Sequence, residues 1–322
     1  MQCIIRAMSS ATNRMPLIDA FKAIASQLIV LHHLSAYGPL SITAQQMLPG
    51  TLCWLYDYAR MAVQVFLVIG GFLAARALSG NGQALAGSPL ALIWKRYLRL
   101  VVPYLAAIGL AIAGAAIADH WMNDEAIPNR ATLAQWLAHV FLLQSLLGYD
   151  SLSAGVWYIA IDFQLFALMA LLLWLGRLRY VAPALVLLVA TSSLFWFNRD
   201  ATWDKWALYF FGSYGLGAAA WWASERKQLA AWLGVIATLA IATLILDFRP
   251  RIALALAVAL ALGFSRRSGL LERWPNAKPL AFLGQISYSV FLVHFPICLI
   301  VNALFVQLGF SSPGAAVFGL FF

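Results

Sequence analysis

The chain has 322 residues, of which 63% are hydrophobic and 10% are charged, and its mean hydropathy is +0.82. This composition excludes a soluble protein of two globular domains and indicates a polytopic helical membrane protein. The net charge of +9 does not indicate nucleic-acid binding, because the basic residues lie in short loops between apolar runs, where they determine membrane topology.

Apolar runs of helical length recur along the whole chain. The predicted helices cover residues 17–37, 54–78, 97–118, 133–147, 157–176, 180–197, 206–223, 229–246, 250–265, 281–309 and 313 onward. The last run stops at Phe322 and is too short to span, so we expect this helix to be incomplete in the given sequence. We predict a short cytoplasmic tail, 1–16, followed by a single transmembrane domain, 17–322.

The run 133–147 is short and contains Gln135, His139 and Gln144. If this run does not cross, only six of the 21 basic residues lie on the outer side, which is the expected bias. If it crosses, every later loop changes side and the bias is lost. We therefore predict an all-α bundle of about ten transmembrane helices, both termini cytoplasmic, with 133–147 re-entrant or interfacial. The six outer residues are Arg60, Arg130, Arg199, Lys205, Arg249 and Arg251.

The first apolar run, 17–37, carries an unusual set of polar side chains on one face. A helix advances about 100° per residue, so Lys22 and His33 fall within about 20° of each other. The residues within about 40° of Lys22 are Asp19, Ser26 and Tyr37. Ionisable groups are costly in hydrocarbon, so this face should contact protein or a water-filled cleft. An alternative is that Lys22 extends to the interface and the histidines are packing residues.

Three ionisable residues from separate helices fall in the outer third of the membrane in this topology: His33, Asp162 and His294. A histidine can accept a proton from a hydroxyl near neutral pH, and a carboxylate such as Asp162 can orient the imidazole and stabilise its charged form. Taken alone, His294 is equally typical of an interfacial aromatic belt.

Arg96 and Arg99 lie one turn apart at the predicted inner end of the third helix, where two guanidinium groups can bind one anion. The alternative is a plain topology signal. Glycines at 70–71, 212, 215 and 217 are typical of close helix contacts. The three cysteines are scattered and no phosphate loop or zinc motif is present, so we predict no metal site.

Five segments between about residues 16 and 300 resemble acyltransferase family 3, the bacterial integral-membrane acyltransferases that include polysaccharide O-acetylases. They are LIDAFKAIASQLIVLHH (Lys22, His33), VFLVIGGFLAARAL, WKRYLRLVVPYL (Arg96, Arg99, Pro103, Tyr104), VWYIAIDFQLFAL (Trp157, Asp162, Gln164) and FLGQISYSVFLVHFPI (Gly284, Ser287, Tyr288, His294, Pro296). The chain departs from the family pattern at three of these positions. Asp162 stands for glutamate, Gly70 for serine and Lys22 for arginine.

The resemblance implies transfer of an acyl group, often acetyl, from a cytoplasmic acyl-CoA to a hydroxyl of a glycan outside the bacterial inner membrane. It implies His33 as general base or transient acyl carrier, with Asp162 and His294 orienting it or binding the acceptor. The implied donor-binding residues are Lys22, Arg96 and Arg99. The residues implied to support the acceptor or the structure are Gln164, Tyr37, Trp157, Ser287 and Tyr288.

The expected partners are the lipid bilayer, acyl-CoA, the glycan and polysaccharide-assembly proteins, with no permanently bound cofactor and no nucleic acid. Two other functions use the same residues. A transporter or glycan flippase could use the His/Asp cluster for proton coupling or substrate binding, although the two halves show no obvious inverted repeat. A non-catalytic subunit of a polysaccharide-assembly complex is the other. Acyl-CoA binding distinguishes the enzyme from both.

Overall fold

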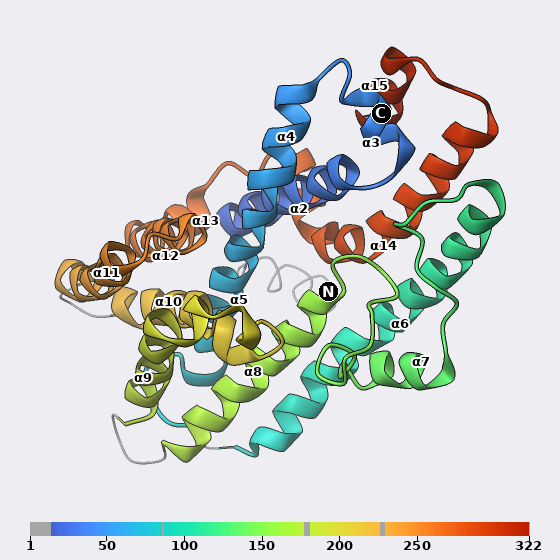
Figure 1. Cartoon of the computed structure of the whole chain (residues 1–322). Coiled ribbons are helices and arrows are strands. Elements are labelled where there is room, and N and C mark those ends of the chain that lie inside the picture. Colours follow the sequence, from blue (N-terminus) through green and yellow to red (C-terminus); the bar gives the residue numbers. More distant parts are fainter. Residues whose placement is uncertain (1–13, 86, 177–180, 226–228, 322) are drawn as a thin grey trace, which may run out of the picture.

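The computed structural model describes residues 14–85, 87–176, 181–225 and 229–321. These residues form helices and loops and contain no strand, which confirms the predicted all-α class (Figure 1). Residues 1–13 of the predicted tail lie outside the described part of the chain.

The helices vary greatly in length, from one turn to 33 residues. The α-helices are α2 (Pro16–Ala36), α3 (Gly38–Ala44), α4 (Pro49–Tyr58), α5 (Val63–Ser79), α6 (Pro89–Trp121), α7 (Leu133–Val140), α8 (Trp157–Leu175), α9 (Val181–Phe195), α10 (Ala207–Ser224), α11 (Leu229–Leu246), α12 (Pro250–Ser268), α13 (Leu270–Arg273), α14 (Lys278–Gln307) and α15 (Pro313–Phe321). Three 3-10 helices join them: η2 (Ala59–Ala62), η3 (Phe197–Arg199) and η4 (Ala201–Trp203).

Six segments of the described chain are long and apolar enough to cross a membrane, which makes this a membrane protein. They are Pro16–Ala36, Pro49–Ser79, Pro89–Trp121, Trp157–Leu175, Val181–Arg199 and Lys278–Gln307. The other four predicted crossings correspond to α10, α11, α12 and α15, which do not meet the same criterion over their described residues. The count of ten crossings and the cytoplasmic termini stay predictions.

Helix α10 is enclosed by protein, because it packs against α5, α8, α9 and α12. Every residue from Tyr209 to Ser224 is buried. A Cβ atom added to Gly217 would collide with the Val68 carbonyl, and one added to Gly71 would collide with the Tyr214 carbonyl. Glycine at these positions lets the backbones of α5 and α10 approach closely, as predicted. Because α10 is covered by protein on all sides, polar side chains such as Ser213 can lie on its surface without contacting lipid.

The segment predicted not to cross contains α7, whose eight residues span only about 12 Å. Thr132 and Gln135 form a capping box at its start. His139 joins it to the following loop, because its Nδ1 donates to the Gln135 carbonyl at 2.8 Å and its Nε2 accepts from the Leu152 amide at 3.1 Å. In agreement with the prediction, this segment is too short to span a bilayer.

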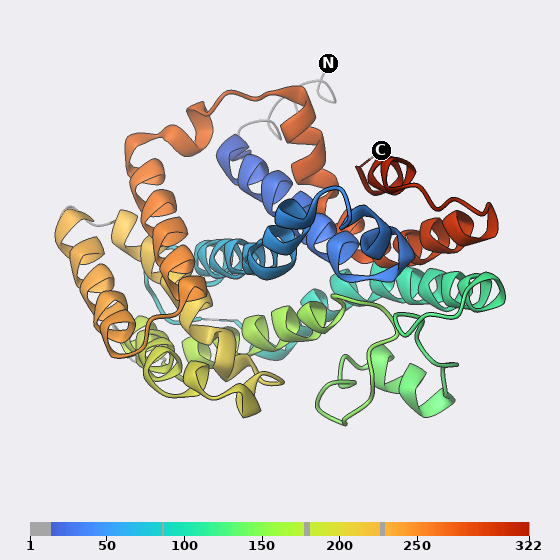
Figure 2. The same cartoon turned by 45° about the horizontal axis from the view of Figure 1, so that its top comes forward.

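Helices α2 and α14 lie side by side near the middle of the bundle (Figure 2). Their backbones approach closely at Gly284, where an added Cβ would collide with the backbone of Asp19. Beyond the far end of α2, the Asn302 side chain of α14 accepts a hydrogen bond from the Leu40 amide at 2.9 Å. This packing holds the facing residues of the two helices in register.

Candidate active site

Two histidines face each other where α2 packs against α14. The ring centroids of His33 and His294 are 4.8 Å apart, and both side chains are buried. Tyr37, one turn after His33, stacks on it at 5.6 Å with an interplanar angle of 9°. Phe295 meets the edge of Tyr37 at 5.4 Å. The predicted convergence of His33 and His294 is therefore present, and the aromatic rings fix the orientation of His33.

The hydrogen bonds of this pair identify the free ring nitrogens. His294 Nδ1 lies 2.7 Å from the Phe291 carbonyl, which can only accept, so Nδ1 carries the hydrogen and Nε2 of the neutral ring is an acceptor. His294 Nε2 and His33 Nδ1 are both buried without a hydrogen-bond partner. Leaving such an atom unpaired costs about 1–3 kcal/mol, and sites with this cost are often functional.

A glycine that the sequence did not single out borders both histidines. Gly155 has a φ of +83°, a conformation that favours glycine. A Cβ atom placed there would lie 3.6 Å from His33 Nε2 and 3.6 Å from His294 Cε1. The loop before α8 therefore passes directly over the imidazole pair. The only signal in the sequence was a glycine two residues before the recognised Trp157.

His33 also lines a cavity of about 700 Å³. Most of its walls come from helices α2, α5, α8, α10, α12 and α14 and from the loops beside them. The lining residues are Ile29, His32, His33, Asp57, Tyr58, Arg60, Met61, Val63, Gln64, Gly155, Trp157, Asp204, Tyr209, Phe210, Phe248, Arg249, Pro250, Arg251 and Phe291. His33 thus lies at the wall of this cavity, whose lining contains both charged and apolar side chains, and His294 packs against His33.

Asp162 does not contact His33, because it is paired with an arginine. Its Oδ2 accepts a hydrogen bond from Arg96 Nη2 at 2.6 Å, and the guanidinium lies 5.3 Å from the Phe166 ring. The sequence predicts Arg96 at the inner end of its helix, but α6 begins at Pro89, so Arg96 lies about 10 Å inside the helix. At that depth a carboxylate is its best partner, since charges within a bundle pair with one another.

The two arginines of α6 have different surroundings. Arg96 is partly buried against Asp162, whereas Arg99 is exposed. Arg96 is therefore engaged by a carboxylate and Arg99 is the more accessible of the two, and their shared binding of an anion stays a prediction. Lys22 lies near the start of α2, where its Nζ is 3.1 Å from Asp19 Oδ1, and it is separated from His33 by about 16 Å of helix.

Two of the predicted support residues hold helices together, and a third bonds within its own helix. Gln164 accepts from the Ala207 amide at 3.0 Å and donates to the Lys205 carbonyl at 3.3 Å, which joins α8 to the start of α10. The Tyr288 hydroxyl donates to the Leu100 carbonyl of α6 at 3.0 Å. Ser287 donates to the Gly284 carbonyl of its own helix. The other two, Tyr37 and Trp157, border the histidines and the cavity.

The model of the family Acyl_transf_3, described as an acyltransferase domain, matches residues 16–322. The chain belongs to acyltransferase family 3. No curated protein and no solved structure matches it. For this acyltransferase, the family match and the six apolar segments together support a membrane-embedded enzyme. Within the matched residues, His33 lines the cavity and His294 packs against it.

Proposed function

We propose that this protein is a membrane O-acyltransferase that moves an acyl group, acetyl in the simplest case, from an acyl-CoA-type thioester to a hydroxyl of a periplasmic or surface glycan. The observation that supports this most is the buried pair His33–His294, of which His33 lines the cavity. We place the enzyme in the bacterial inner membrane, where the thioester is on one side and the glycan is on the other.

In the proposed reaction His33 is the general base. Its ring accepts the proton of the acceptor hydroxyl as the oxygen attacks the thioester carbonyl carbon. The new C–O bond forms and the C–S bond breaks, so that the acyl group is transferred and the coenzyme leaves as a thiolate. The imidazolium then returns its proton to that thiolate, which leaves the neutral histidine and a free thiol. A general base of this kind contributes about 10²–10⁴-fold to the rate.

His294 acts on His33 as a positioning residue. Its hydrogen bond to the Phe291 carbonyl keeps Nε2 as an acceptor, so this nitrogen stabilises the protonated form of the neighbouring ring. Tyr37 holds the plane of His33 by stacking. Asp162 has an indirect role in this proposal, since it neutralises Arg96 and fixes α6 against α8.

In this proposal Lys22 and Arg99 supply positive charge for the coenzyme phosphates. Because Arg99 is exposed, its replacement by Gln should raise the KM for acyl-CoA without disturbing the fold. Arg96 is a positioning residue, because Asp162 already occupies its guanidinium.

The test uses the purified full chain in lipid nanodiscs, radiolabelled acetyl-CoA and glycan isolated from the producing cells. His33→Ala should abolish acetyl transfer and leave thermal unfolding unchanged. His120→Ala is the matched control, because His120 is exposed at the end of α6. Retained turnover in His33→Ala would refute the proposed base. Binding of glycan with no effect of acetyl-CoA on stability or turnover would favour a transporter instead.

A further inference from the structure

The cavity that contains His33 is bordered by arginines that the sequence indicated only as topology residues. Arg60 comes from η2. Arg249 is the residue directly before α12, and Arg251 lies in the first turn of α12. They belong to segments nearly 190 positions apart in the sequence. Cationic side chains from distant segments around one cavity are typical of a site that binds an anion.

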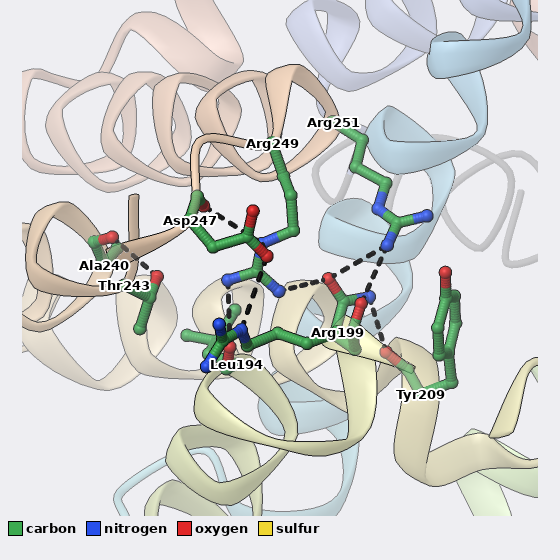
Figure 3. Close-up of polar contacts among 9 residues, drawn as sticks. Leu194, Arg199, Tyr209, Ala240, Thr243, Asp247, Arg249 and Arg251 are labelled. Carbon is green, nitrogen blue, oxygen red and sulfur yellow. Dashed lines mark hydrogen bonds and ion pairs between the residues drawn. The ribbon is translucent and has the colours of Figure 1, made fainter. Parts of the chain in front are cut away.

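Arg249 is the fixed part of this group (Figure 3). Its Nη1 donates to Asn198 Oδ1 at 2.7 Å and its Nη2 to the Leu194 carbonyl at 2.9 Å, while its Nε contacts Asp247. Burial lowers the pKa of Arg249, Asp247 raises it, and repulsion from Arg251 and Arg199 lowers it again. The charge is therefore held in place and incompletely neutralised, because Asp247 is shared with Arg199.

Arg251 and Arg60 keep N–H groups for a ligand. Arg251 donates from Nη2 to the Asn198 carbonyl at 2.8 Å, with Asn198 Oδ1 at 3.5 Å, and lies 4.9 Å from the Tyr209 ring; its Nε is buried and has no hydrogen-bond partner within the described chain. Arg60 is exposed, and the hydrogen bond that it donates within the described residues runs from Nε to the Asp57 carbonyl of its own turn. Guanidinium groups with free N–H pairs bind carboxylate and phosphate bidentately.

Two carboxylates, Asp57 and Asp204, also line the cavity, and both are exposed. Solvent screens charges at such positions strongly. Arg249, by contrast, is buried, so its field acts on the cavity with little screening. The lining therefore has three arginines against two carboxylates, a formal excess of positive charge.

We propose that the acceptor of this enzyme is an acidic saccharide, whose carboxylate or phosphate binds between Arg60 and Arg251 while its hydroxyl reaches His33. This inference rests on the proposed acyl transfer. Arg249 is the fixed charge behind the site, and Trp157 supplies an aromatic wall beside it. The arginines select the acceptor, and the histidine pair performs the transfer.

The experiment compares methyl glucuronoside with methyl glucoside, two glycosides that differ only at C6, where the first has a carboxylate and the second a hydroxymethyl group. Binding is measured by calorimetry on the full chain in zwitterionic nanodiscs, and acetyl transfer is measured in parallel. The charged glycoside should bind at least tenfold more tightly. Arg251→Gln and Arg60→Gln should each remove most of that difference and leave the affinity for the neutral glycoside unchanged.

Arg130→Gln is the matched control, since Arg130 lines a different cavity, beside the end of α6. It should not change the preference. Because Arg251 bonds the backbone at Asn198, Arg60→Gln gives the decisive result if Arg251→Gln fails to fold. Equal affinity for the two glycosides, or no binding of the charged one, overturns the inference. Charge-dependent binding without acetyl transfer to any acceptor overturns only the proposed function.

Discussion

Arg96 Nη2 and Asp162 Oδ2 are 2.6 Å apart and join α6 to α8 in the interior of the bundle. This ion pair takes Asp162 away from the histidines and leaves His33 in contact with a second imidazole. If His33 is the general base, its neighbours are therefore His294 and Tyr37. Asp162 contributes indirectly, because its ion pair with Arg96 holds α6 against α8. The arrangement leads to several measurable expectations.

The ion pair itself should be important for stability. Asp162→Asn leaves the mostly buried guanidinium of Arg96 without a counter-charge, and losing one partner of a buried pair costs about 3 kcal/mol. Arg96→Gln should cost a similar amount. The double variant should recover part of the loss, because neither charge then remains unpaired. Thermal unfolding of the four proteins in nanodiscs measures the coupling, and strictly additive losses would show that the two residues act independently.

A methyl group at position 155 should interfere with the acceptor. Gly155→Ala places a carbon 3.6 Å from His33 Nε2, so we expect a drop of about tenfold in kcat/KM for the acceptor and no change in donor binding. Gly148→Ala is the control, because Gly148 also has positive φ, +76°, but open space around its Cβ. Both variants carry the same backbone strain, about 1–2 kcal/mol. Equal activities would place the acceptor elsewhere.

The crossing of α5 and α10 should not tolerate a side chain. Gly71→Ala or Gly217→Ala must move backbone atoms apart, and overpacking of this kind costs about 1–3 kcal/mol. Gly109→Ala in α6 is the comparison, since nothing lies within 4 Å of the added carbon and alanine favours the helix by up to about 1 kcal/mol. Unfolding midpoints check this, and equal midpoints for Gly71→Ala and Gly109→Ala would contradict the close contact.

The loop after α7 should open at acid pH. Burial lowers the pKa of His139 below its ordinary 6.5, and the Gln135 carbonyl partly opposes this shift. The unfolded segment then binds a proton more readily than the folded one, so the stabilisation is complete above pH 6.5 and is lost as the pH falls toward the folded pKa. Protonation at Nε2 also removes the acceptor of the Leu152 amide.

Hydrogen exchange of residues 141–152 at pH 7.5 and pH 5 measures that opening. Protection should fall at pH 5 in the wild type. It should be independent of pH over this range in His139→Gln, which cannot titrate. A pH-independent wild type would mean that His139 remains neutral throughout.

The sequence alone determined the helical class, the polar face of the first long helix and the candidates His33 and His294. These features are encoded locally, because helical periodicity and hydropathy depend on residues a few positions apart. The glycine contacts between α5 and α10 were also readable, since small residues in apolar runs have few other uses.

Only the tertiary structure decided which charges meet. The partner of Asp162 is Arg96, 66 positions away in the sequence. Predicted depth instead paired Asp162 with His33, and it put Arg96 at the end of its helix because α6 begins before its apolar run. Gly155 and the arginines of the cavity were indistinguishable from ordinary loop residues until the packing of distant helices brought them beside His33. Pairing energies depend on distances in space, and a helical pattern contains no information about neighbours from other helices.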